Sequence, residues 1–168
     1  MSTSKKKTLL VSSDGEEFEI DEAIAVQSRI VAAFYEEEID EAIAVPNNRF
    51  TIENVTGSVL SKVIAYLKKH AVSVGDGGES SSSSSAEEDL KKWDAEFMET
   101  DQKTIFDLML AANYLTIKPL LDLTCKTVAS MILACKDVDE VRERFNIVND
   151  YTPEEEAEVR KENQWAFE

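Results

Sequence analysis

Apolar residues at helical spacing dominate the chain from residue 57 onward, and this pattern constrains its fold class most. Between residues 57 and 70 they form one stripe at i, i+1, i+4, i+5 and i+8: Val59, Leu60, Val63, Ile64 and Leu67. Such a stripe is typical of a helix with one face in a core. Residues 103–115 are apolar on more than one face, which predicts a helix buried on several sides. A mostly helical chain is therefore expected.

Two segments among the first fifty or so residues follow the period of β-strands instead. Residues 8–20 alternate apolar and polar positions around Asp14-Gly15, which predicts a β-hairpin closed by a two-residue turn. Residues 22–36 return to helical spacing, with Ser28 as an internal cap. A third short strand is expected within residues 43–52, where Pro46 restricts it to an edge or a broken strand. Together the two periods predict an α+β fold that is mostly helical.

The composition changes abruptly at residues 75–89 (GDGGESSSSSSAEED), which contain no large apolar residue. A segment of this kind cannot offset the entropy cost of ordering, so a disordered acidic, serine-rich loop is expected, with structure resuming at Leu90. Ser84 and Ser85 each precede a glutamate by three residues, the pattern of an acid-directed kinase. An unmodified loop is the favoured interpretation.

A second helical stripe follows residue 116. Thr116 is expected to cap this helix, and Pro119 is tolerated in its first turn. Along the helix the apolar positions are spaced by four, three, four and three residues: Leu121, Cys125, Val128, Ile132 and Cys135. Asp137 and Glu140 predict a capping box for the next helix, whose apolar line is Val138, Val141 and Phe145.

The last seventeen residues predict a well-capped helix with little to hold it in place. Thr152, Pro153 and Glu155 have the types and spacing of an N-cap, a first helical residue and a capping box. Few apolar residues lie within this short helix, which would be marginal alone in water. Trp165 and Phe167 then follow in a polar terminus. Large aromatic residues in such a terminus indicate a surface for another protein.

Bulk charge excludes several function classes. Thirty-four acidic against eighteen basic residues give a formal net charge of -16 and a pI near 4.5, so nucleic acid and anionic membranes would be repelled. The basic run at residues 5–7 is interpreted as a solvated terminus, with a weak nuclear address as the alternative. The sequence lacks a signal peptide and any apolar stretch of about 18 residues. A soluble protein of the nucleus and cytoplasm is expected.

Chemistry-bearing motifs are missing from the sequence. Cys125 and Cys135 lie ten residues apart in an apolar run, which favours two buried, reduced thiols over a metal site. His70 is the single histidine, placed near a helix end, and nothing marks a nucleophile for it to activate. Phosphate-binding glycine loops and zinc-protease motifs do not occur. No enzyme activity, cofactor or metal is therefore expected, and an interaction module remains.

Several motifs then occur in order from Trp93 onward. They are Trp93-Asp94, Asp101-Gln102, residues 105–115 (IFDLMLAANYL), residues 120–129 (LLDLTCKTVA), residues 145–147 (FNI), Asn149-Asp150 and residues 160–167 (RKENQWAF). This series resembles the Skp family, the adaptor subunits of SCF (Skp–cullin–F-box) ubiquitin ligases. The ending Trp-Ala-Phe-Glu is similar to that of plant members. The resemblance runs from about residue 8 to residue 168 and omits the serine-rich loop.

The resemblance implies a BTB/POZ fold, a small three-stranded sheet wrapped by helices, plus a C-terminal two-helix extension. In this chain it implies a flexible N-terminus at residues 1–7, a BTB/POZ domain at 8–132 with the disordered loop at 75–89, and the extension at 133–168. The F-box-binding region would lie at about residues 110–168.

The resemblance also implies the partners. Family members bridge a cullin, with its RING-box protein in the assembled ligase, to an F-box protein that brings a substrate for ubiquitination and proteasomal degradation. Asn113 and Tyr114 match the family's cullin contacts. The expected F-box contacts are Leu120, Leu121, Cys125, Val128, Ile132, Val141, Phe145, Ile147, Trp165 and Phe167. An intramolecular core is an equal alternative for Leu120, Val128 and Ile132.

Some positions depart from the family pattern. Family members usually have Lys-Gly-Lys-Thr-Pro-Glu-Glu-Ile before the penultimate helix, whereas this chain has LACKDVDEV at residues 133–141. The glycine that would end the preceding helix is missing, so a longer helix is expected, and Asp137 replaces the threonine cap. The chain therefore resembles a diverged paralogue. The alternative function is a BTB/POZ-like scaffold that binds F-box proteins in a complex without ligase activity.

Overall fold

The computed structural model describes residues 7–37, 49–74 and 84–166, and within these the chain forms two compact units. The first unit comprises residues 1–128 and the second residues 129–168. The division falls inside helix α6 (Lys118–Leu133). The predicted boundary after residue 132 lies four residues further along the chain and stays a prediction.

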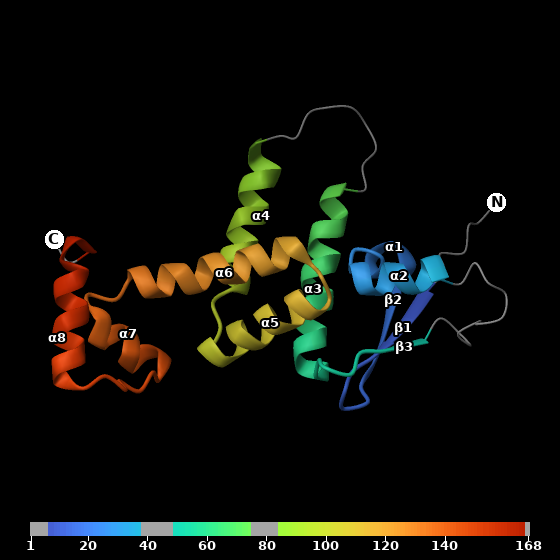
Figure 1. Cartoon of the computed structure of the whole chain (residues 1–168). Helices are drawn as coiled ribbons and strands as arrows, with labels where there is room; N and C mark the ends of the chain where they lie inside the picture. Colours follow the sequence, from blue (N-terminus) through green and yellow to red (C-terminus); the bar gives the residue numbers. More distant parts are fainter. Residues whose placement is uncertain (1–6, 38–48, 75–83, 167–168) are drawn as a thin grey trace, which may run out of the picture. The chain divides into compact units, whose positions relative to one another are not determined.

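The first unit contains a small three-stranded sheet. Strand β1 (Lys7–Val11) pairs antiparallel with β2 (Glu17–Asp21), and β3 (Arg49–Thr51) pairs parallel with β1, giving the order β2-β1-β3 (Figure 1). The predicted hairpin is confirmed, and the predicted third strand lies at an edge of the sheet. Residues 43–48 of that prediction lie outside the described residues. The predicted α+β, mostly helical class is confirmed.

The hairpin turn differs from the prediction by one residue. Gly15 N donates to Ser12 O at 3.0 Å, and Ser12 N donates to Glu16 O at 2.9 Å, so Ser13 and Asp14 are central and Gly15 follows at φ 84°. This is the common three-residue connection, in which glycine supplies the positive φ. The Asp14 carboxylate accepts from Gly57 N at 2.8 Å, at the start of the next long helix. Hydrogen bonds from the Ser12 hydroxyl and Gly57 N–H lower the pKa of Asp14.

Two short helices follow β2 in place of one continuous helix. These are α1 (Glu22–Ala25) and α2 (Arg29–Glu37), and Ser28 separates them. The Ser28 hydroxyl accepts from Val31 N at 3.5 Å and donates to Leu115 O at 2.9 Å. The predicted internal cap is confirmed, and it also ties this segment to a residue distant in sequence.

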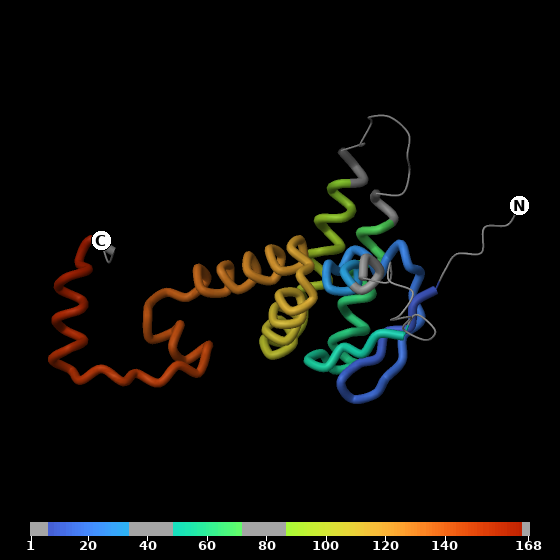
Figure 2. The backbone as a smooth tube through the Cα atoms, turned by 45° about the vertical axis from the view of Figure 1, so that its right-hand side comes forward, coloured from blue at the N-terminus to red at the C-terminus, as the bar shows by residue number. Residues whose placement is uncertain are grey.

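Helix α3 (Gly57–Val74) is the centre of the first unit. It lies between the sheet with α1 and α2 on one side and helices α4 (Ser84–Phe97) and α5 (Gln102–Tyr114) on the other (Figures 1 and 2). Its predicted stripe is entirely buried: Val59, Leu60, Val63, Ile64 and Leu67. From α5 the core receives Leu108, Ala111 and Ala112. The prediction that α5 is buried on several sides is wrong at Leu110, which is 68% exposed.

Helix α4 begins earlier than expected. Residues 84–89 were assigned to the disordered loop but form its first turns, whereas residues 75–83 lie outside the described residues. The acidic residues that suggested disorder sit at the positive end of the helix dipole, where they favour a helix. Aromatic contacts hold α4 against α3: the Tyr66 ring lies 5.9 Å from that of Phe97, and the His70 ring lies 6.2 Å from that of Trp93. His70 Nε2 lies 2.8 Å from Asp94 Oδ1, so this histidine joins two helices.

The connection from α5 to α6 has a strained residue. Thr116 adopts φ 56°, Thr116 N donates to Asn113 O at 3.1 Å, and Ile117 N donates to Ala112 O at 2.8 Å. These two bonds are those of a Schellman motif, which ends a helix with a left-handed residue. The prediction that Thr116 caps the following helix is therefore wrong, because its backbone terminates the preceding one. Among the described helices, none is long and apolar enough to cross a membrane.

Candidate partner-binding site

Helix α6 presents different residues to the core and to the surface. Leu120 and Thr124 are fully buried. The Thr124 hydroxyl donates to Leu121 O at 2.8 Å, which satisfies it inside the core. Leu120 belongs to the core and offers no surface, so the expected F-box contact is corrected in favour of its equal alternative, an intramolecular core residue. Pro119 lies in the first turn as expected.

The predicted stripe lies beside this buried face. Leu121 and Val128 are half-buried, Cys125 is exposed, and Ile132 is 44% exposed. Cys125 and Cys135 are free thiols, but the expectation that both are buried is wrong, since Cys135 is only half-buried. The spacing of three and four residues identified which residues share a face of α6. It did not predict how far each side chain is buried, because α6 is apolar on two adjacent faces. The helix ends at Leu133, before Asp137.

The helices of the second unit have strong caps. At α7 (Val138–Phe145) the Asp137 carboxylate accepts from Glu140 N at 2.8 Å, while Glu140 Oε2 accepts from Lys136 N at 2.7 Å, one residue before the cap. At α8 (Pro153–Glu162) the predicted capping box of Thr152 and Glu155 is complete. Basic residues occupy the last turn of both helices, where they complement the helix dipole.

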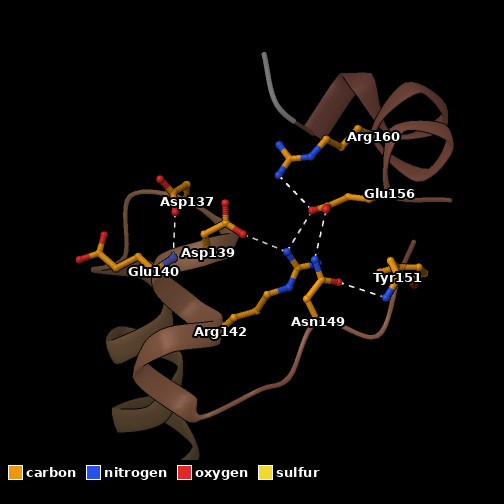
Figure 3. A network of polar contacts seen from close by, with 8 residues as sticks. All are labelled: Asp137, Asp139, Glu140, Arg142, Asn149, Tyr151, Glu156 and Arg160. Atoms are coloured by element: carbon orange, nitrogen blue, oxygen red, sulfur yellow. Dashed lines mark hydrogen bonds and ion pairs between the residues drawn. The ribbon is translucent and has the colours of Figure 1, made fainter. Parts of the chain in front are cut away.

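A polar network joins α7, α8 and the segment between them (Figure 3). The Glu156 carboxylate accepts from Arg142 Nη1 at 3.0 Å, from Asn149 Nδ2 at 3.2 Å and from Arg160 Nη2 at 3.3 Å. Arg142 Nη1 also donates to Asp139 at 3.0 Å. The hydrogen bond from Arg142, followed by those from Asn149 and Arg160, lowers the pKa of Glu156.

Large apolar side chains are exposed mainly in the second unit. Of those exposed in the described part of the chain, all but Val26 and Leu110 lie there: Ile132, Leu133, Val138, Ile147, Val148, Tyr151 and Trp165. Leu133 and Val148 are 85% and 84% exposed. Among residues 129–165 none is buried. The second unit therefore has apolar surface but no core of its own in the described part.

The predicted F-box contacts in this unit have unequal exposure. Val141 and Phe145 are half-buried, whereas Ile147 and Trp165 are 53% and 77% exposed. Phe167 lies outside the described residues. Four further apolar residues are exposed that the sequence pattern did not assign to a surface: Leu133, Val138, Val148 and Tyr151. Val148 and Tyr151 lie in a non-helical connection, so the spacing of apolar residues along a helix could not predict their exposure.

The predicted cullin contacts lie in the first unit, at the end of α5. Asn113 is exposed, and Tyr114 is half-buried and packs against the core. Leu110 precedes Tyr114 by one helical turn and is also exposed, so it adds an apolar side chain to the same face of α5. Within residues 7–37, 49–74 and 84–166, no group of three or more His, Cys, Asp or Glu side chains could hold a metal ion.

Comparisons with known proteins match both parts of the chain. Residues 6–72 match the tetramerisation domain of the Skp1 family, and residues 118–166 match its dimerisation domain. SKP1-like protein 4 of Arabidopsis thaliana is 53% identical over the full length of both chains. SKP1-like protein 1A of the same plant is 51% identical, covering 98% of this chain and 99% of the relative. SKP1-like protein 1 of Oryza sativa subsp. japonica is 50% identical, covering 98% and 96%.

These matches confirm the resemblance to plant Skp-like proteins, and the sheet and helices of the first unit agree with a BTB/POZ fold. About half of the residues are identical to those of these relatives over the full length, and both ends of the chain match models of the same family. The chain belongs to the Skp1 family.

Proposed function

We propose that this protein is a non-catalytic adaptor of an SCF ubiquitin ligase. In this role it bridges a cullin scaffold, with its RING-box protein, and an F-box protein, so that recruited substrates are ubiquitinated and degraded by the proteasome. Membership of the Skp1 family supports the adaptor role. The two partners are assigned to different units of the chain.

The observation that carries the proposal is the coreless second unit. Residues 129–168 are too few to stabilise themselves by burial, because chains of about 40 residues usually need disulfides, metals or a partner. Both cysteines are free, and the described part of the chain holds no metal-binding cluster. Exposed apolar side chains concentrate in this unit, which marks a protein-binding surface. A helical F-box would supply the missing burial.

Trp165 is the strongest single candidate for an anchor in this surface. Its side chain is 77% exposed, although tryptophan is usually largely buried. Tryptophan is enriched among binding hot spots because it buries a large area with few rotatable bonds. It follows α8 in a 3-10 turn (Gln164–Ala166), whose preceding helix is fixed by a capping box. We assign Trp165 to the F-box partner.

We assign the cullin to the C-terminal end of α5 in the first unit. Asn113 presents a polar side chain to solvent and Tyr114 is partly exposed, so together they offer a hydrogen-bonding and an aromatic contact. The rigid core beneath them keeps the pair in position, since Ala111, Ala112 and Leu115 are all buried. The net charge of -16 disfavours nucleic acid and anionic membranes as partners.

Two variants test this division of surfaces. Trp165→Ala should lose the F-box protein but keep the cullin when each is mixed with purified chain, while Tyr114→Lys should lose the cullin but keep the F-box protein. Equal loss of both partners in either variant, with circular dichroism unchanged, would contradict the assignment. Glu158→Gln, an exposed change elsewhere on α8, serves as the control.

Co-purification of the tagged protein from plant cells tests the ligase itself. Recovery of an F-box protein and a cullin together supports the ligase adaptor. An F-box protein recovered without any cullin would support a scaffold in another complex. We also propose that the protein occurs in both nucleus and cytoplasm, which imaging of a tagged copy would check.

A further inference from the structure

The polar network of the second unit joins α7 and α8 to the connection between them. This connection, residues 146–152, carries three exposed apolar side chains: Ile147, Val148 and Tyr151. A non-helical connection with solvent on its apolar residues would ordinarily be mobile. Here its start, its middle and its end each hold a hydrogen bond to a helix end or to the network.

These hydrogen bonds lie at several points of the connection. At its start, Asn146 adopts φ 55° and Ile147 N donates to Arg142 O at 2.8 Å. In its middle, Asn149 Nδ2 donates to Glu156 at 3.2 Å, while Asn149 Oδ1 accepts from Tyr151 N at 3.2 Å. The side chain of Asn149 therefore links the connection to α8 and also fixes its own turn (Figure 3).

Glu156 and Arg142 form the central pair. Their side chains are 26% and 17% exposed, less than Asp139 at 74% and Arg160 at 49%. Partial shielding from solvent reduces screening by salt, so this pair is stronger than an ordinary surface pair. One carboxylate thus receives donors from α7, from the connection and from its own helix.

Within the described part of the second unit, no apolar core fixes the positions of the helices and of the connection between them. Among residues 129–165 none is buried, and helices of 8 and 10 residues are marginal alone in water. Ordering such segments at the moment of binding weakens affinity, whereas a surface ordered in advance binds more tightly.

We propose that Arg142, Asn149 and Glu156 are positioning residues, which hold the 146–152 connection in its binding conformation before the partner arrives. Through them Ile147, Val148 and Tyr151 are presented as one preformed apolar ridge. The partner class, a helical F-box, rests on the proposed function; the ordering of the ridge does not. Val148 and Tyr151 thereby become contacts in addition to those predicted from the sequence.

The test compares Glu156→Gln with the matched control Glu158→Gln in the full chain. Both remove one negative charge from α8, but the Glu158 side chain is exposed and forms no hydrogen bond or ion pair with another described residue. Hydrogen exchange of the free protein is measured over residues 138–162, with residues 57–74 as the internal reference. Binding to a purified F-box polypeptide is measured by calorimetry at several temperatures. Asn149→Asp, which places a carboxylate against Glu156, is the second variant.

Glu156→Gln and Asn149→Asp should both speed exchange over residues 138–162 and leave residues 57–74 unchanged. Binding should weaken by about tenfold, with a more negative heat-capacity change, because the ridge then orders on binding. Exchange no faster than in Glu158→Gln would overturn the proposal. So would weaker binding with unaltered exchange and heat capacity, since Glu156 would then be a direct contact. Failure of the wild-type chain to bind any F-box polypeptide would refute the proposed function, while exchange would still decide the ordering.

Discussion

Replacing Thr116 with glycine should stabilise the first unit, although it removes a side chain. Thr116 holds φ 56° at the end of α5, and the two hydrogen bonds of its Schellman motif depend on that angle. A left-handed conformation costs an L-residue about 1–2 kcal/mol, and a β-branched residue is among the least suited to it. Glycine adopts it without this cost.

Two effects oppose the gain. Glycine has more conformational freedom in the unfolded chain, which costs about 0.5–1 kcal/mol. The half-buried threonine side chain also loses its contacts. Before the lost contacts are subtracted, the expected stabilisation is about 0.5–1 kcal/mol, equivalent to a rise in Tm of about 1–4 °C for a chain of this size, and the lost contacts reduce it. Thr116→Asn should give a similar gain, because asparagine tolerates the left-handed region without the added freedom of glycine.

Urea denaturation would measure this effect. In a Trp165→Phe background the fluorescence of Trp93, in α4, reports on the first unit alone. The midpoint should rise at constant m-value, since the surface exposed on unfolding hardly changes. Thr116→Ala keeps a Cβ and should gain less than glycine. Destabilisation by Thr116→Gly of more than about 0.5 kcal/mol would refute the reasoning, because the threonine side chain would then outweigh its backbone strain.

Three further outcomes are expected. Leu120→Ala should lower the unfolding free energy by about 3 kcal/mol in urea titrations, because the side chain is fully buried, and should leave F-box affinity per folded molecule unchanged; weakened binding would restore it as a contact. Trp93→Ala should cost about 2 kcal/mol through lost aromatic packing on α4, whereas Lys91→Ala on the same helix should cost little. Glu155 and Glu156 both have lowered pKa values, from the Thr152 backbone bond and the Arg142 bond respectively. The stabilisation from these two carboxylates is complete above the unfolded pKa of 4.5 and is lost as pH falls through their folded pKa values. The helical circular dichroism signal should therefore weaken in acid, and the loss should be smaller in Glu156→Gln.

The fold class and most helices and strands could be predicted, because the spacing of apolar residues and the residue types at turns and caps indicate them directly. The stripe of α3 is buried as expected, and Ser28 and Thr152 cap the helices they were expected to cap. Thr116 shows where residue type misleads. Threonine is a common N-cap, but the hydrogen bonds of the α5 terminus impose a conformation that its type disfavours.

The depth of each residue on α6 could not be read from spacing. Leu120 and Leu121 are adjacent and chemically identical, yet the first is fully buried and the second half-buried. Thr124 is polar and fully buried because its hydroxyl bonds a carbonyl of its own helix, so polarity did not mark the surface either. Which of two apolar faces turns inward is decided by the core that Leu120 joins, and that information is tertiary.

The division between a unit with a core and a unit without one explains how such a chain can be both stable and dependent on a partner. Burial in the first unit supplies folding free energy whether or not a partner is present. In the second unit the same apolar side chain types remain in solvent, so under the proposed function their burial would contribute to binding instead. Short capped helices and a carboxylate with three donors order that surface without burying it. A larger core in the second unit would make it more stable alone but would consume the apolar area that association requires.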